Sequence, residues 1–144
     1  MWKASPGLCD YVANSGPYVQ VLNGLVLRIY GGTEPASSAG SVESNTLLCE
    51  IDPNGEGLNF ESGSSPGMIS KDSSQLWSGL ELAAGTATFF RLEGRSDAGY
   101  EDVHAIRLQG SVGAVGGDMI LSNTSFVNGS PRTIKSFTIV IPSI

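Results

Sequence analysis

The stretch that most constrains the fold is residues 85–94, Gly-Thr-Ala-Thr-Phe-Phe-Arg-Leu-Glu-Gly. It is rich in β-branched and aromatic residues, and a glycine closes each end, as is typical of a β-strand. Side chains of a strand point alternately to opposite faces, so Phe90 and Leu92 are expected on the core side. Phe89 and Arg91 would lie on the other face, which we expect to be partly covered.

Other short apolar runs, separated by turn residues, are also predicted to be strands. They are residues 25–30, 46–51, 58–60, 68–69, 105–112, 118–121 and 133–141. Residues 18–22 form a further run, and Asn23-Gly24 after it is a typical two-residue hairpin turn. This run is therefore expected to pair with residues 25–30, with a simple approach segment as the alternative.

The only helix candidate is residues 7–15, where Leu8, Tyr11 and Val12 fall on one helical face. Together these patterns predict an all-β protein, an antiparallel β-sandwich of the jelly-roll or immunoglobulin type, with a small barrel as the alternative. Long Gly/Ser loops at 31–45, 63–67 and 95–102 and at most one short N-terminal helix complete the prediction. We expect an N-terminal segment, 1–17, and one sandwich domain, 18–144.

The charge of the chain argues against two classes of partner, nucleic acids and anionic membranes. The 144 residues include 8 Lys and Arg against 14 Asp and Glu, a formal net charge of −6. Nucleic acids and anionic membranes are bound through clustered cations, and the few cations here are scattered singly. We therefore expect no direct nucleic-acid partner and no membrane partner.

The first residues lack the apolar run of a signal peptide, so synthesis and retention in the cytoplasm of the producing cell are expected. Cys9 and Cys49 are then expected to be free thiols rather than a disulfide.

Three groups of residues are of types that can carry out chemistry, and each has a simpler interpretation. Ser65 lies in Gly-Ser-Ser-Pro-Gly, which matches a nucleophile-elbow pattern, but that elbow belongs to an α/β sheet. His104 is the only histidine, and a packed or surface role is favoured. The calcium-like set Asp52, Asn54 and Glu56 has too few ligands for an EF-hand, so a plain turn is favoured. No catalytic, metal or cofactor residue is predicted, and the chain is expected not to be an enzyme.

The aromatic residues divide by context. Those in patterned strands are expected in the core: Trp77, Phe89, Phe90 and Phe137. Those in the tail or loops are the candidate contacts with partner proteins, because Trp and Tyr are enriched at interfaces: Trp2, Tyr11, Tyr18 and Tyr100.

Several motifs, taken in order, resemble one family. They are Leu-Arg-Ile-Tyr-Gly-Gly-Thr-Glu-Pro-Ala (27–36), Leu-Leu-Cys-Glu-Ile (47–51), Trp-Ser-Gly (77–79), Gly-Thr-Ala-Thr-Phe-Phe-Arg (85–91), Gln-Gly-Ser-Val-Gly (109–113) and Asp-Met-Ile-Leu (118–121). The family consists of small proteins encoded among the virion genes of tailed bacteriophages and prophages. The likeness runs from about Ser5 to Pro142, and the acidic insert around 97–103 is longer here.

The resemblance implies a virion structural protein, made in the cytoplasm of a bacterial host and carried in the virion, with no catalytic residues to transfer. The implied partners are the major capsid protein or other virion subunits, together with further copies of the chain. A capsid decoration or cement protein is the first expectation. A tail or neck component is one alternative, and a glycan-binding β-sandwich module is another. A hydrolase built on Ser65 would require His104 beside it.

Overall fold

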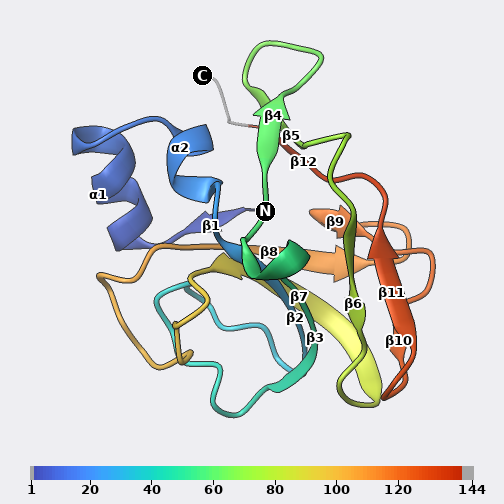
Figure 1. The fold of residues 1–144 in the computed structure, drawn as a ribbon. Coiled ribbons are helices and arrows are strands. Elements are labelled where there is room, and N and C mark those ends of the chain that lie inside the picture. The colour runs from blue at the N-terminus through green and yellow to red at the C-terminus, as the bar shows by residue number, and fades with distance from the viewer. Residues whose placement is uncertain (1, 141–144) are drawn as a thin grey trace.

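The main sheet is built around the strand that the sequence singles out, β7 (Gly85–Glu93). The computed structural model describes residues 2–140 (Figure 1). The sheet order is β1-β8-β7-β2-β3, and all neighbours in it are antiparallel. The flanking strands are β1 (Lys3–Ala4), β8 (Arg107–Gly113), β2 (Val26–Gly31) and β3 (Thr46–Ile51). Two short strands join its margins: β10 (Ser125–Phe126) is antiparallel to β7, and β9 (Met119–Ile120) is parallel to β8.

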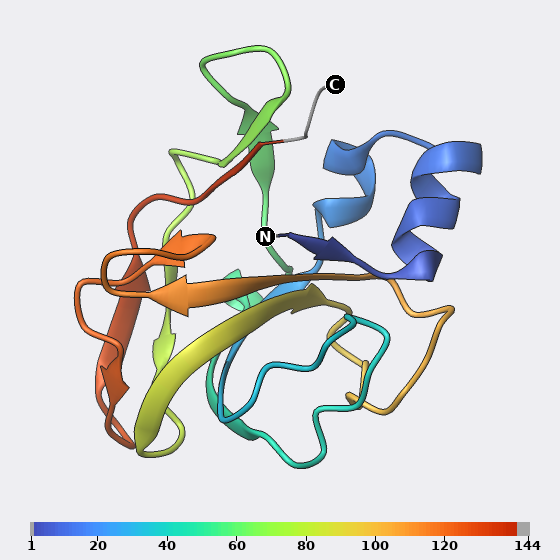
Figure 2. The same ribbon diagram turned by 180° about the vertical axis from the view of Figure 1, so that it is seen from behind.

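Two smaller antiparallel sheets form the second layer. One pairs β6 (Trp77–Leu80) with β11 (Pro131–Ile134), and the other has the order β12-β5-β4. The latter strands are β12 (Thr138–Val140), β5 (Met68–Lys71) and β4 (Phe60–Ser62), and the turn η1 (Pro53–Gly55) precedes them. Figures 1 and 2 show these strands beside and above the main sheet, with the two helices at its other end. The prediction of an all-β antiparallel sandwich is confirmed.

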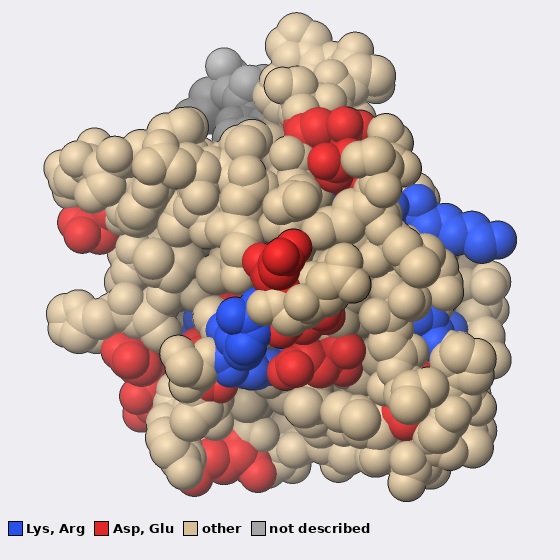
Figure 3. Space-filling view, viewed as in Figure 1, with Lys and Arg blue, Asp and Glu red and all other residues tan. Residues whose placement is uncertain are grey.

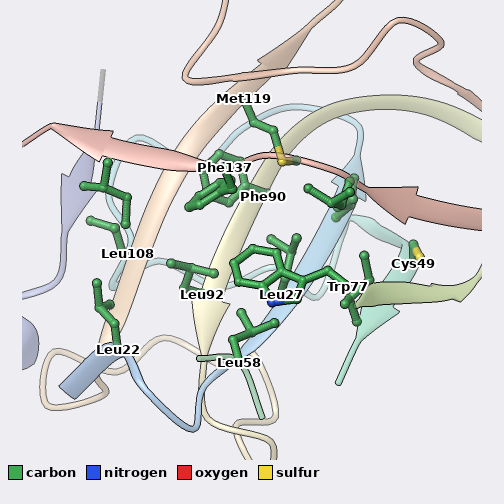
Figure 4. Packing of buried hydrophobic residues seen from close by; sticks show 14 of the residues in the cluster. Leu22, Leu27, Cys49, Leu58, Trp77, Phe90, Leu92, Leu108, Met119 and Phe137 are labelled. Carbon is green, nitrogen blue, oxygen red and sulfur yellow. The ribbon is translucent and has the colours of Figure 1, made fainter. Parts of the chain in front are cut away.

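The core lies between the layers (Figure 4). Phe90 and Leu92 of β7 point into it and are fully buried, as predicted. The second layer contributes Trp77 and Phe137, and the Phe137 ring packs edge-on against Phe90 with centroids 5.5 Å apart. Edge-to-face contacts of this kind add to the hydrophobic gain of burying the rings.

The opposite face of β7 is covered more completely than expected. Phe89 is fully buried and stacks on Tyr30 of β2, with ring centroids 5.1 Å apart and planes 11° apart. Arg91 is also fully buried. The cover consists of residues 32–45 and 94–106, two long loops that lie side by side against this face in Figures 1 and 2.

The prediction of at most one helix is wrong, because residues 2–140 contain two α-helices. The expected helix is α1 (Pro6–Asn14), which begins with Ser5 as its N-cap. Residues 18–22, expected to be a strand, form α2 (Tyr18–Leu22). Its Val21 and Leu22 are buried in the core, which a single helical turn can achieve at this end of the sheet.

The expected hairpin at Asn23-Gly24 is also absent, and the chain uses these residues differently. The Asn23 side chain accepts a hydrogen bond from the N–H of Phe60, and Gly24 donates to the carbonyl oxygen of Leu58. Strand β2 is meanwhile paired on both edges, by β3 and β7. No edge of β2 is therefore left for residues 18–22.

The last expected strand, 133–141, is divided into β11 and β12, which belong to different sheets. Ile134 enters the core from the first and Ile139 from the second. Residue 141 lies outside the described residues.

At the other end of the chain, Leu8 belongs to the core cluster of the sandwich, and Trp2 packs against that cluster. Residues 2–17 therefore share one core with the rest of the described chain.

Candidate functional site

A cluster of buried charges lies on the loop-covered face of the main sheet. Three central strands each contribute an arginine: Arg28 from β2, Arg91 from β7 and Arg107 from β8. Glu93 is fully buried among them, and its Oε1 accepts hydrogen bonds from Arg28 Nη1 at 3.1 Å and from the Tyr30 hydroxyl at 2.7 Å. Buried charges are costly unless they are paired in this way.

The same arginines hold the two covering loops. Arg107 donates to both carboxylate oxygens of Asp97, at 2.7 and 2.8 Å, and to the carbonyl oxygen of Ser38 at 3.2 Å. Arg28 donates to the carbonyl oxygens of Arg95 and Asp97, each at 2.7 Å. Both guanidinium groups therefore hold loop backbone against the sheet.

Burial and pairing with nearby groups together set the pKa values in the cluster. Burial alone would raise the pKa of Asp97, but the hydrogen bonds from Arg107 hold that pKa below its ordinary value. For Tyr30, burial and the neighbouring Glu93 carboxylate both raise the pKa of the phenol. At neutral pH Asp97 is therefore ionised and Tyr30 is protonated. We interpret the cluster as a structural one that holds the loops on the sheet.

Sequence reasoning missed this cluster, although a signal was present. Arg91 and Glu93 lie two residues apart, on the same face of a predicted strand. Arg107 and Gln109 are spaced in the same way on another predicted strand. Both strands carry polar residues on the face expected to be outside, and both adjoin long loops. Such loops are candidates to cover that face.

Three exposed leucines lie at and beside β6: Leu80 is its last residue, and Leu76 and Leu82 lie just outside its two ends. Leu76, Leu80 and Leu82 are 68%, 60% and 49% exposed, whereas Trp77 and Glu81 between them are buried. We call these three residues the leucine row. Figure 3 shows mainly uncharged atoms over β6 and β11, while carboxylates gather over the neighbouring η1 turn. A row of apolar side chains on a firm sheet is suited to protein contact.

The four aromatic residues predicted as partner contacts do not form one exposed surface. Trp2 packs edge-on against Phe90 and Phe137, with centroids 5.6 and 5.8 Å away. Tyr11 and Tyr18 are half-buried against the core, and burial raises the pKa of Tyr18. Tyr100, 60% exposed, is the only aromatic ring that is largely free in the described part of the chain. Among residues 2–140, no second largely exposed aromatic ring accompanies Tyr100.

The candidate catalytic and metal-binding residues are placed apart or used structurally. Ser65 lies in the turn between β4 and β5, and His104 lies in the loop before β8. Figures 1 and 2 show this turn and this loop far apart. Asp52 accepts hydrogen bonds from Arg95 and from the N–H of Gly57, and the Arg95 hydrogen bond lowers its pKa. Residues 2–140 contain no group of three side chains arranged to hold a metal ion.

Both cysteines are free, as predicted. Cys9 is exposed on α1, whereas Cys49 is buried in β3. Burial raises the pKa of the Cys49 thiol to about 11. Within residues 2–140 no helix has the length and apolar character needed to cross a bilayer.

Comparisons of the chain with models of known protein families, with curated proteins and with solved structures find no match. The geometry described above and the sequence motifs therefore carry the functional argument.

Proposed function

We propose that this protein is a structural component of a bacteriophage virion, and that it acts as a capsid decoration or cement protein by binding capsid subunits. The ordered motifs that resemble virion-encoded proteins support this proposal. The observation that carries it is the leucine row, which gives a rigid β-domain an apolar face for another protein.

Leu80 of the leucine row belongs to β6, and the chain here is held on both sides. β6 pairs with β11, and Glu81 at its end bridges to Cys49 of β3. The side chains are therefore positioned before a partner arrives, which reduces the ordering cost of binding. Full burial of a leucine is worth about 1.5–3 kcal/mol, so covering the row would supply a useful part of the binding free energy.

The cations of the chain support a protein partner over nucleic acid. Every lysine and arginine except Lys135 donates a hydrogen bond to a carboxylate or carbonyl oxygen within residues 2–140. Few cationic groups are thus available for phosphates. A tail or neck component would use the same leucine row and is the second candidate.

Co-sedimentation tests the proposal. The chain is produced together with the major capsid protein encoded by the same genome, and assembled particles are separated on a gradient. The wild-type chain is expected in the particle fraction at a fixed ratio to capsid protein. Leu80→Glu is expected to remain at the top of the gradient, because it places a charge in the proposed interface.

Val115→Glu is the matched control, since Val115 is 90% exposed in the turn before β9 and lies outside the leucine row. It should sediment with particles as the wild type does. Absence of the wild-type chain from heads, or equal binding by Leu80→Glu, would overturn the capsid proposal. Recovery of the chain from purified tails alone would select the tail or neck candidate.

A further inference from the structure

Strand β11 has one edge that no described strand covers. Its other edge pairs with β6, where Pro131 lies opposite Leu80. The N–H of Glu81 donates to the carbonyl oxygen of Ser130 at 2.7 Å, a bond that flanks the pair of Leu80 and Pro131. Bonded and non-bonded pairs alternate along antiparallel strands. Pro131 and Thr133 therefore occupy non-bonded positions, and their backbone groups point away from β6.

The residue types agree with this arrangement. Proline has no N–H to donate, so within sheets it is confined largely to positions where that group would face outward from an edge. Thr133 retains both its N–H and its carbonyl group on the same open edge. Pro131, Thr133 and Lys135 are all exposed. An unpaired edge of this kind can accept an extended segment as an added strand.

A hollow of about 430 Å³ lies beside this edge. Residues 132–136 form one wall, and residues 120–122 with Ala114 form the other. Figures 1 and 2 both show β9 close to β11 at this point. Ile120 is 61% exposed there, whereas Leu121 is buried. The hollow thus combines an unpaired backbone with apolar side chains, the two features that an added strand requires.

The charges around the hollow indicate the chemistry of its occupant. No carboxylate lines it, whereas at least one lines each of four other hollows in the described part of the chain. Arg132 is already bound to Glu81 at 2.9 Å. Lys135 is exposed and has no ion-pair partner among residues 2–140. In a chain of net charge −6, an approaching carboxylate meets no carboxylate among the residues that line this hollow.

We propose that the open edge of β11 binds an extended segment of a partner protein by strand addition. The segment alternates apolar and polar residues. Its backbone bonds to the N–H and carbonyl groups of Thr133, its apolar side chains lie on Ile120, and one of its carboxylates pairs with Lys135. This inference concerns the open edge of β11, next to the leucine row but distinct from it. It does not depend on the protein being part of a virion.

Peptide titration of the full chain, labelled with nitrogen-15, tests this proposal by nuclear magnetic resonance. The probe is a capped seven-residue peptide, Thr-Val-Glu-Val-Glu-Val-Thr. Saturable shifts are expected for the amides of Ile120, Thr133 and Lys135. A second peptide with lysine in place of both glutamates should bind more weakly, because it faces Lys135 with like charge. Lys135→Glu should weaken binding of the first peptide about fivefold, as expected for reversing one exposed ion pair.

The backbone bond is tested separately. Thr133→Pro removes the N–H on the open edge and is expected to abolish binding, whereas Thr133→Val keeps the N–H and should bind as the wild type does. A peptide methylated on alternate backbone nitrogens tests the same bonds with the protein unchanged, and it should not bind. Any of three results overturns the proposal. The first is no saturable shift at about 1 mM peptide, which corresponds to negligible affinity. The others are shifts confined to another surface, and equal binding of the glutamate, lysine and methylated peptides.

Discussion

Phe90 shows how much of the stability rests on a single side chain. It is fully buried on β7 and touches the rings of both Trp2 and Phe137 edge-on. Phe90→Ala would remove these contacts and leave a cavity between the two layers. We expect the free energy of unfolding to fall by about 3–5 kcal/mol.

Denaturant unfolding measures this loss, and Val115→Ala is the control because Val115 is 90% exposed. The control should change stability by less than about 0.5 kcal/mol. A loss below about 1 kcal/mol for Phe90→Ala would mean that the core collapses around the missing ring.

The two thiols are expected to react very differently in the folded protein. Cys9 is exposed, whereas Cys49 is buried and its thiol has a pKa of about 11. Only the thiolate reacts, so at pH 8 Cys49 is both inaccessible and almost entirely protonated. Thiol titration should therefore count one fast group in native protein and two after unfolding. Fast reaction of both groups in native protein would contradict the burial of β3.

Single residues also mark the limit of sequence reasoning. Phe90, Leu92 and Trp77 were placed correctly because strand alternation and residue size are local properties. Arg91 was expected on a partly covered face, yet it is fully buried and donates to the carbonyl oxygen of Gly40 at 2.7 Å. That burial depends on a loop that is distant in the sequence, which alternation along one strand does not reveal.

At the scale of elements, the loop 94–106 is held to the sheet mainly through Asp97 and the arginines that face it. Arg107 binds the Asp97 carboxylate and Arg28 binds its carbonyl oxygen. The folded pKa of Asp97 is lowered. The pair therefore contributes its full stability above about pH 3.9, the ordinary Asp value, and loses it as the pH falls through the lower folded pKa.

Acid titration should consequently release this loop. The free energy of unfolding of the wild type is expected to decline below about pH 4 more steeply than that of Asp97→Asn, which has no carboxylate to protonate at this position. Asp10→Asn is the matched control, since Asp10 is exposed on α1. Parallel pH profiles for the wild type and Asp97→Asn would show that the ion pair does not hold the loop.

Elements differ in how well the sequence predicts them. Strands β3 and β7 were located almost to the residue, because alternation and flanking turn residues agree there. Helix α2 was mistaken for a strand because its five residues are too few to show a helical period. The open edge of β11 was beyond prediction, since it depends on which strands become neighbours.

At the scale of the whole molecule, the N-terminal segment is part of the sandwich. β1 pairs with β8, Trp2 packs on the core rings and Leu8 is fully buried. Deleting residues 1–17 should therefore lower the unfolding midpoint strongly or prevent folding, because it uncovers Phe90 and the edge of β8. Circular dichroism during heating measures the effect. A truncated chain that melts like the full chain would show that the segment is dispensable.

The buried charge cluster also has a consequence for biosynthesis. The hydrogen bond from Arg28 to Glu93 spans 65 positions, and that from the Arg107 backbone to the Ser5 hydroxyl spans 102. A ribosome exposes Arg28 well before Glu93 and Asp97 exist, so the hairpin of β2 and β3 emerges with Arg28 paired to Glu50 alone. The loop-covered face of the main sheet can close only after β8 has left the exit tunnel. The chain is therefore expected to remain open through most of its translation and to complete its main sheet in one late step.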